Sequence, residues 1–292
     1  MTVQIRFITD PVCSWSWGVE PQVRSLMWEF GEGVRFHWVM GGLARSYGPR
    51  YRDEEGAIGS GPSCFADLMS HWLEVAVATG MPADPRLWTQ APLGSTYPAC
   101  MAVKAAAEQG GDLAYAYLRR VREGIFAERR KLDHAEALVG EAGTAGLDVE
   151  RFRIDLGSHA IVEAFGADLE EARTITDEAR AAGAVRKTEG KERLVFPTAF
   201  FAGAGGTRTA LYGSQPYAAY REAAIAAGAE PVREARPSAM EAVERFGRVA
   251  TREVEELTGQ PAPVVRAELW SLAREWKLRA TPTLTGELWE TA

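Results

Sequence analysis

The sequence predicts an α/β protein with a large N-terminal domain and a small C-terminal one. Three observations support this class. Strand patterns open the chain and return only after a long series of helical patterns at about 62–187. A Pro- and charge-rich stretch at 229–237 is typical of a linker. Beyond the linker, helical patterns are followed by a short hairpin. We therefore expect domains at 1–228 and 238–292.

Composition narrows the classes of function. The 292 residues are 46% hydrophobic and 25% charged, and the net charge of −7 disfavours a broad nucleic-acid or acidic-membrane surface. The sequence has no uninterrupted apolar run of about 18 residues, so no membrane span is expected. No signal-peptide pattern follows Met1, so we expect a cytoplasmic chain. Three cysteines are not expected to form a disulfide framework in that compartment.

The elements of the first domain follow a defined order. Strand patterns fall at 2–10, 34–40, 193–203 and 207–213, and helix patterns lie at 17–31 and 214–228. The order is therefore strand, helix, strand, helical insert, strand, strand and helix. A thioredoxin-like domain with a helical block inserted in its middle has this order.

The C-terminal domain has a different character. Helix patterns at 240–250, 251–259 and 261–277 precede an alternating hairpin pattern at 278–290, which is the winged-helix arrangement. From Ser238 onward the sequence has seven basic and nine acidic residues. This negative balance disfavours binding to nucleic-acid phosphates. Arg266 and Arg274 share one helix and could contact DNA, but a solvated face is the simpler interpretation. We expect packing or protein interaction rather than nucleic-acid binding.

The loop "TDPVCSWSWGVEP" carries the main candidate for chemistry, Cys13 in a C-x-x-S motif. A thiol at a helix N-terminus meets unpaired N–H groups that favour the thiolate, and the Ser16 hydroxyl lies one turn away. Serine cannot resolve a mixed disulfide, so release would need glutathione or another external thiol. The alternative is that Cys13 only packs, as most lone cysteines do. Its polar neighbours Asp10 and Ser14 favour a reactive or ligand-binding thiol.

Other candidates are weaker. Cys64 and Cys100 lie on helix patterns and are expected to pack. The four histidines, His37, His71, His134 and His159, lack the spacing of metal ligands, so no metal site is expected. Trp15 and Trp17 either pack the cysteine loop down or form an apolar wall for a substrate, and the sequence leaves both interpretations open.

The stretch "VFPTAFF" is the second informative one. Proline inside a strand pattern loses a ladder hydrogen bond, so it belongs at a strand start, an edge or a bulge. A cis Phe196–Pro197 bond would expose the backbone of Phe196. Together with a cysteine after the first strand, this pattern indicates a thiol site.

These motifs together resemble the DsbA-like branch of the thioredoxin superfamily. "DPVCSWSWG" resembles its D-P-x-C-x-W-C-W-G loop, "VMGGL" the end of its second strand and "FPTAFF" its cis-proline strand, and the match covers roughly residues 3–227. The resemblance implies that Cys13 is the nucleophile and that Phe196, Pro197 and Thr198 contact an extended thiol-bearing peptide. Ser16 replaces the resolving cysteine, which argues against dithiol turnover. Kappa-class glutathione transferases and hydroxychromene-carboxylate isomerases, whose loop serine corresponds to Cys13, bind glutathione.

The C-terminal part extends the resemblance. "AVERFGRVATREVEEL", "LWSLAREWKLRA" and "GELWE" resemble the winged-helix-like part of the YjbH (SpxH) proteins. Those proteins are adaptors that present the regulator Spx to the protease ClpXP. The resemblance thus implies a protease-targeted regulator as a partner.

Three functions follow from these patterns. The first is mixed-disulfide exchange by Cys13 with protein thiols or glutathione. No cofactor is expected, and glutathione is a candidate co-substrate. The second is a non-catalytic adaptor that holds a partner protein. The third is a glutathione-dependent isomerase or transferase. Cys13 favours the first, whereas the missing second cysteine and the extra C-terminal domain favour the second.

Overall fold

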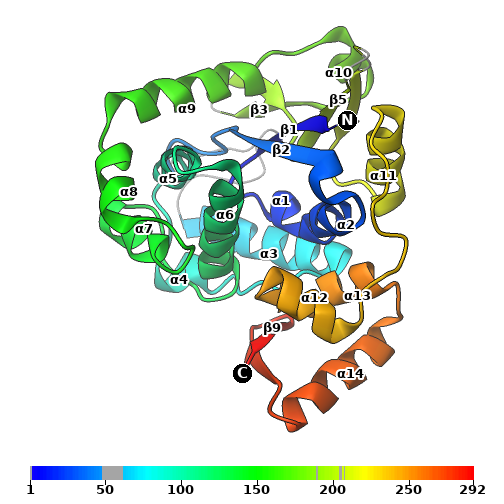
Figure 1. Cartoon of the computed structure of the whole chain (residues 1–292). Helices are drawn as coiled ribbons and strands as arrows, with labels where there is room; N and C mark the ends of the chain where they lie inside the picture. Colours follow the sequence, from blue (N-terminus) through cyan, green and yellow to red (C-terminus); the bar gives the residue numbers. More distant parts are fainter. Residues whose placement is uncertain (1, 48–61, 189, 204–205, 207) are drawn as a thin grey trace.

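A four-stranded sheet forms the centre of the first part of the molecule (Figure 1). The computed structural model describes residues 2–47, 62–188, 190–203, 206 and 208–292, with side chains from Phe65 onward in the second of these segments. The strands lie in the order β2-β1-β5-β6. Their bounds are β1 (Val3–Thr9), β2 (Val34–Met40), β5 (Thr198–Ala202) and β6 (Arg208–Tyr212).

The register of this sheet brings distant segments together. β1 is parallel to β2, with Val3 opposite Val34, and antiparallel to β5, with Ile8 opposite Thr198. β1 buries both of its faces near its end, as an inner strand with helices on each side must. The strands predicted at 2–10, 34–40 and 207–213 and the thioredoxin-like order are confirmed for this sheet.

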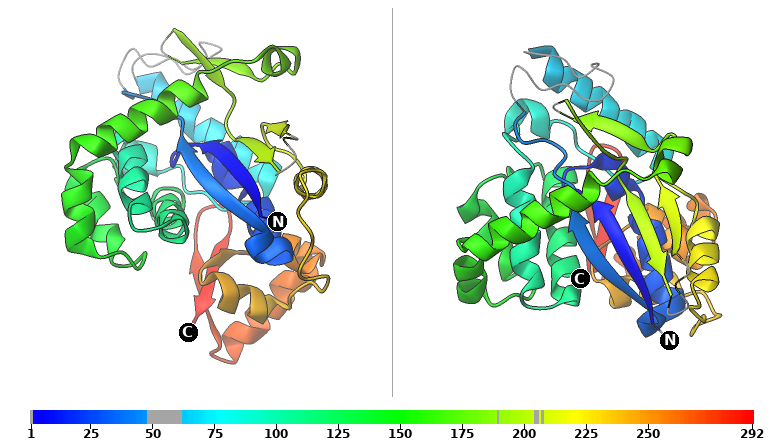
Figure 2. Two further views of the ribbon diagram at one scale, coloured as in Figure 1. Left: turned by 45° about the horizontal axis from the view of Figure 1, so that its top comes forward. Right: turned by 90° about the horizontal axis from the view of Figure 1, so that it is seen from above.

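Helices surround the sheet on both sides and at its edges (Figures 1 and 2). α1 (Ser14–Gly18), α2 (Glu20–Phe30) and the short 3₁₀ helix η1 (Gly31–Gly33) connect β1 to β2, and α11 (Tyr217–Ala226) packs beside β6. The inserted block packs several of its helices against β2, and its last helix lies near β5 (Figure 1). It contains α3 (Pro62–Thr79), α4 (Leu87–Gln90), α5 (Tyr97–Ala107), α6 (Gly111–Phe126), α7 (Ala135–Ala142), α8 (Val149–Leu156), α9 (His159–Ala172) and α10 (Asp177–Ala181).

The end of the insert differs from the prediction. Helix ends at Ala181, and β3 (Val185–Thr188) pairs with β4 (Lys191–Leu194) in a separate two-stranded sheet. The single strand expected at 193–203 is therefore wrong. The chain leaves β4 at Leu194 and turns at the cis Phe196–Pro197 bond before β5 begins.

The C-terminal part contains the three expected helices and the hairpin. Its elements are α12 (Ala239–Phe246), α13 (Thr251–Thr258), α14 (Ala262–Arg274), β8 (Leu278–Pro282) and β9 (Glu287–Thr291). A two-residue strand, β7 (Val249–Ala250), was not predicted and pairs with β9. The side chains of Val243, Val254, Leu269 and Trp289 form a small core that is separate from that of the first part.

Buried ion pairs join the two parts, in addition to the packing of α13 on α2. Glu253 is fully buried and accepts from Arg119 Nη1 and Nη2 at 2.8 and 2.9 Å. It also lies 3.2 Å from Arg24 Nη1. The Arg119 guanidinium in turn stacks on the ring of Trp17, 4.4 Å from its centroid. Arg119 therefore links Glu253 of the C-terminal part to Trp17 in α1, the helix that begins next to Cys13.

Candidate functional site

The β1–α1 loop places Cys13 at the N-cap of α1. Its backbone N–H donates to the Asp10 carbonyl at 3.2 Å, and its Sγ accepts from the Ser16 N–H at 3.4 Å. Because β1 lies next to β5 in the sheet, the loop after β1 faces the segment that precedes β5. This adjacency brings together the two motifs that the sequence singled out.

The proline segment lies against the thiol. The Phe196–Pro197 bond is cis, and the Phe196 carbonyl oxygen is 3.9 Å from Cys13 Sγ. The Thr198 hydroxyl donates to the Val195 carbonyl at 2.7 Å and so fixes the turn before β5. The structure therefore places four predicted site residues in one neighbourhood: Cys13, Phe196, Pro197 and Thr198.

Gly41 permits this arrangement by its lack of a side chain. A Cβ at this position would lie 2.0 Å from the nearest atom of the Phe196 ring. The Gly41 N–H donates to the Thr9 carbonyl at 2.7 Å, which holds the end of β2 against the end of β1. A larger residue would push the ring, and with it the carbonyl beside Cys13, out of place.

Burial decides the electrostatics of Cys13. The residue is only 6% exposed and sits in an apolar cluster with Ile8, Val39 and Phe196. Burial raises the pKa of the Cys13 thiol, although the hydroxyl and the backbone N–H of Ser16 both act in the opposite direction. The predicted lowering of this pKa is therefore wrong. α1 has only five residues, and its N-terminal groups do not compensate for the loss of water.

Ser16 acts on Cys13 through both its backbone and its side chain. Its backbone N–H is the group that donates to Cys13 Sγ. The hydroxyl is buried and has no hydrogen-bond partner among the described residues. The hydroxyl nevertheless lowers the pKa of the Cys13 thiol, which is the direction expected from its place one turn after the cysteine.

The two tryptophans of the loop separate into different roles. Trp17 is 2% exposed, donates from Nε1 to the Pro82 carbonyl at 2.8 Å and stacks on Phe126 with centroids 5.6 Å apart. For Trp17 the structure favours the packing alternative over the substrate wall. Trp15 is half-buried and packs against the apolar cluster around Cys13, and both alternatives stay open for it.

Sequence reasoning missed the role of Asp10. Its buried carboxylate accepts from the Val12 and Leu43 N–H groups, from the Thr96 hydroxyl and from the Cys100 thiol, at 2.8, 2.6, 2.8 and 3.3 Å. Burial raises the pKa of Asp10. The Asp-Pro after β1 was a local signal, but most of the partners come from segments 33–90 residues away. Asp10 ties the cysteine loop to the sheet and to α5.

Of the other two cysteines, only Cys100 has a described side chain, and it does not pair with Cys13. Cys100 is fully buried and donates to Asp10, and burial raises its pKa well above the ordinary value. The side chain of Cys64 lies outside the described residues. Within the described ranges, no group of three His, Cys, Asp or Glu side chains is placed to hold a metal ion. In the same ranges, no helix is both long and apolar enough to cross a bilayer.

Comparisons with known proteins agree with this geometry. A family model described as Thioredoxin matches residues 7–177. The ClpXP adapter protein SpxH of Halalkalibacterium halodurans is 29% identical over 168 residues, 58% of this chain and 53% of that protein, so the match spans about half of the relative's length. SpxH of Shouchella clausii is 24% identical over 298 residues, 99% of this chain and 88% of that protein. The cytosolic disulfide reductase DsbM of Pseudomonas aeruginosa shares the fold, with a TM-score of 0.53 at 20% identity over 76% of this chain and 98% of that one.

Proposed function

The chain belongs to the thioredoxin family, and from this premise we propose that it is a protein adaptor rather than a dithiol oxidoreductase. Relatives named ClpXP adapter protein SpxH support this proposal, and one of them aligns with nearly the whole chain. In this account the thioredoxin-like part and the C-terminal part together hold a partner protein and present it to a ClpXP-type protease.

The environment of Cys13 is the observation that carries the proposal. The thiol is nearly covered, its pKa is raised by burial, and the position of a resolving thiol is taken by Ser16. Cys100 is engaged by Asp10. Rapid dithiol exchange needs an accessible thiolate and a second thiol beside it, and this geometry favours neither.

We further propose how the chain is divided for this role. The thioredoxin-like domain spans 1–228, a linker spans 229–237, and a winged-helix-like domain spans 238–292. The acidic balance of the last domain supports protein contact rather than DNA contact. The buried pair between Glu253 and Arg119 would keep the two domains in one orientation while a partner binds.

The test is reconstituted proteolysis. Purified ClpXP and an Spx-type regulator would be incubated with and without this chain, and loss of the regulator followed over time. The adaptor proposal predicts faster degradation when the chain is present, with saturation as its concentration rises. An unchanged rate, together with no co-purification of the regulator, would refute it.

A second candidate, monothiol exchange, rests on one specific contact. Cys13 Sγ lies 3.9 Å from the carbonyl of the residue before cis Pro197, where an extended thiol-bearing segment would pair, with Trp15 and Thr198 at its sides. With glutathione disulfide, the Cys13 thiolate would form a mixed disulfide and release one glutathione thiolate. Mass spectrometry of the intact chain and of Cys13→Ser would detect this adduct. A wild-type chain that stays unmodified would eliminate this candidate.

A further inference from the structure

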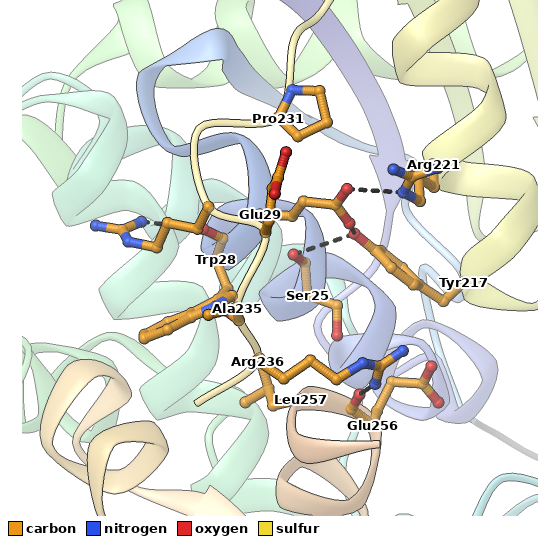
Figure 3. Close-up of a pocket in the computed structure, with 12 residues that line it drawn as sticks. Ser25, Trp28, Glu29, Tyr217, Arg221, Pro231, Ala235, Arg236, Glu256 and Leu257 are labelled. Atoms are coloured by element: carbon orange, nitrogen blue, oxygen red, sulfur yellow. Dashed lines mark hydrogen bonds and ion pairs between the residues drawn. The ribbon is translucent and has the colours of Figure 1, made fainter. Parts of the chain in front are cut away.

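A groove outside the cysteine site lies where α2, α11, the linker and α13 meet (Figure 3). It consists of two adjoining cavities of about 390 and 450 Å³. Both cavities are lined by Glu29, Tyr217, Arg221, Arg236 and Glu256. We call it the junction groove, because an occupant would touch both parts of the molecule and the segment that connects them.

The acidic side chains of the junction groove already have partners. Glu29 accepts from Arg221 Nε at 2.7 Å and from the Tyr217 hydroxyl, as the dashed lines in Figure 3 show. Glu256 accepts from Arg252 Nη2 at 2.7 Å. Both carboxylates are therefore paired with an arginine, so they do not favour a cationic ligand.

Two hydrogen-bonding groups at the groove lack a partner. Ser25 is only 5% exposed, and its Oγ makes no hydrogen bond within the described part of the chain. The Gln22 Oε1 is likewise buried and unpaired there. A buried polar atom without a partner costs about 1–3 kcal/mol, so such atoms point to a group that is supplied from outside.

Arg236 supplies an open charge next to Ser25. Its Nη1 donates to the Glu256 backbone carbonyl at 3.0 Å, and the guanidinium forms no ion pair among the described residues. In Figure 3 its side chain extends beneath Ser25 toward Glu256. Arg236, without an ion pair among the described residues, thus lines the same cavity as the unpaired Ser25 hydroxyl.

The charges around the groove favour an anion. Four arginines line the two cavities, Arg221, Arg233, Arg236 and Arg252, against three glutamates, Glu29, Glu234 and Glu256. This local excess of positive charge lies on a chain whose net charge is −7. A planar carboxylate matches the guanidinium and would also accept from the Ser25 hydroxyl.

We propose that the junction groove binds an acidic side chain, Asp or Glu, of a peptide segment in the partner protein. The Arg236 guanidinium and the Ser25 hydroxyl donate to its carboxylate, and Gln22 Oε1 accepts a backbone N–H of the same segment. The inference rests on the proposed adaptor function, for which it names the chemistry of the partner. It uses neither Cys13 nor the proline segment.

The test uses the full chain and two labelled peptides. One is a Gly-Ser peptide with three glutamates, acetylated and amidated at its ends, and its twin carries glutamines instead. Fluorescence anisotropy should show the glutamate peptide binding at least about tenfold more tightly, with an affinity that falls as salt is added. Arg236→Gln and Ser25→Ala should each weaken binding at least about fivefold. Arg274→Gln, an exposed arginine on α14, is the matched control and should leave binding unchanged.

Equal affinities for the two peptides would overturn the proposal, as would wild-type affinity in Arg236→Gln. An equal loss in Arg274→Gln would show general charge attraction and would also overturn it. Degradation without peptide binding would remove only the groove proposal. Selective peptide binding without any effect on degradation would instead remove the adaptor proposal and leave the groove site standing.

Discussion

Replacing Glu253 by glutamine should loosen the C-terminal part from the thioredoxin-like part. The substitution keeps the shape of the side chain but removes the charge that faces Arg119 and Arg24. Both arginines are nearly buried, with side-chain exposures of 5% and 2%, and Glu253 itself is at 0%. Water therefore cannot replace the lost partner.

The magnitude follows from the burial of these groups. Breaking a buried ion pair by removing one partner costs about 3–5 kcal/mol, because the other charge is left uncompensated. Arg119 keeps a second carboxylate, Glu123, at 2.7 Å, which places the expected loss at the low end, about 3 kcal/mol. The matched control is Glu290→Gln. Glu290 Oε1 lies 2.9 Å from Nη2 of Arg279, whose side chain is 68% exposed. The expected loss in the free energy of unfolding is therefore below about 1 kcal/mol.

Equilibrium urea unfolding, followed by both tryptophan fluorescence and far-ultraviolet circular dichroism, measures these losses. Two probes are needed because separation of the C-terminal part would appear as two midpoints. The reasoning is refuted if Glu253→Gln loses less than about 1 kcal/mol or no more than the exposed control.

Three further predictions concern the site and its surroundings. Because burial raises the pKa of Cys13, iodoacetamide should label it slowly at pH 7, and the rate should rise only at a higher pH than for a free cysteine, whose pKa is about 8.5. The signal should be lost in Cys13→Ser, and a plateau already reached at pH 7 would contradict this prediction. Burial disfavours the charged form of Glu128, but its two arginine partners outweigh this and lower its pKa to about 2. The stability that the charged Glu128 contributes is thus complete above about pH 4.5 and is lost as pH falls toward 2. A plot of Tm against pH in the acidic range should therefore be flatter for Glu128→Gln than for the wild-type chain. Identical slopes would show that Glu128 is not stabilised by its arginine partners. Gly41→Ala should lower the free energy of unfolding by about 1–3 kcal/mol, because the added carbon would lie 2.0 Å from the Phe196 ring. Gly33→Ala is the control, since the nearest atom to its added carbon is 3.5 Å away, and equal unfolding midpoints for the two variants would disprove the steric argument.

The sheet could be predicted from sequence because its strands carry their pattern locally. Val3, Ile5 and Phe7 alternate with polar residues, and all three are buried. The β3–β4 hairpin was missed because most residues of "VRKTEGKERL" are charged, and its only apolar side chains, Val185 and Leu194, stand at the two ends. A pattern of alternating apolar residues cannot indicate a strand pair that contains so few of them.

The chemistry of the site was harder to predict, because it depends on contacts between distant segments. The expected activation of Cys13 used a local rule about helix N-termini, whereas its burial comes from Val39 and Phe196 on other elements. The partners of Asp10 are likewise set by the fold, since Thr96 lies 86 residues away. Pairing of the cysteine loop with the proline segment could be anticipated only by resemblance to known proteins.

The most direct test of the adaptor account compares Cys13→Ser with the wild-type chain in the ClpXP degradation assay. Serine fills almost the same space but cannot form a disulfide. If the chain works by holding a partner, both proteins should accelerate loss of the Spx-type regulator to the same extent, under reducing and oxidising conditions alike. If the variant loses the acceleration while remaining folded and able to bind the regulator, the Cys13 thiol is required for function, and the adaptor account is contradicted.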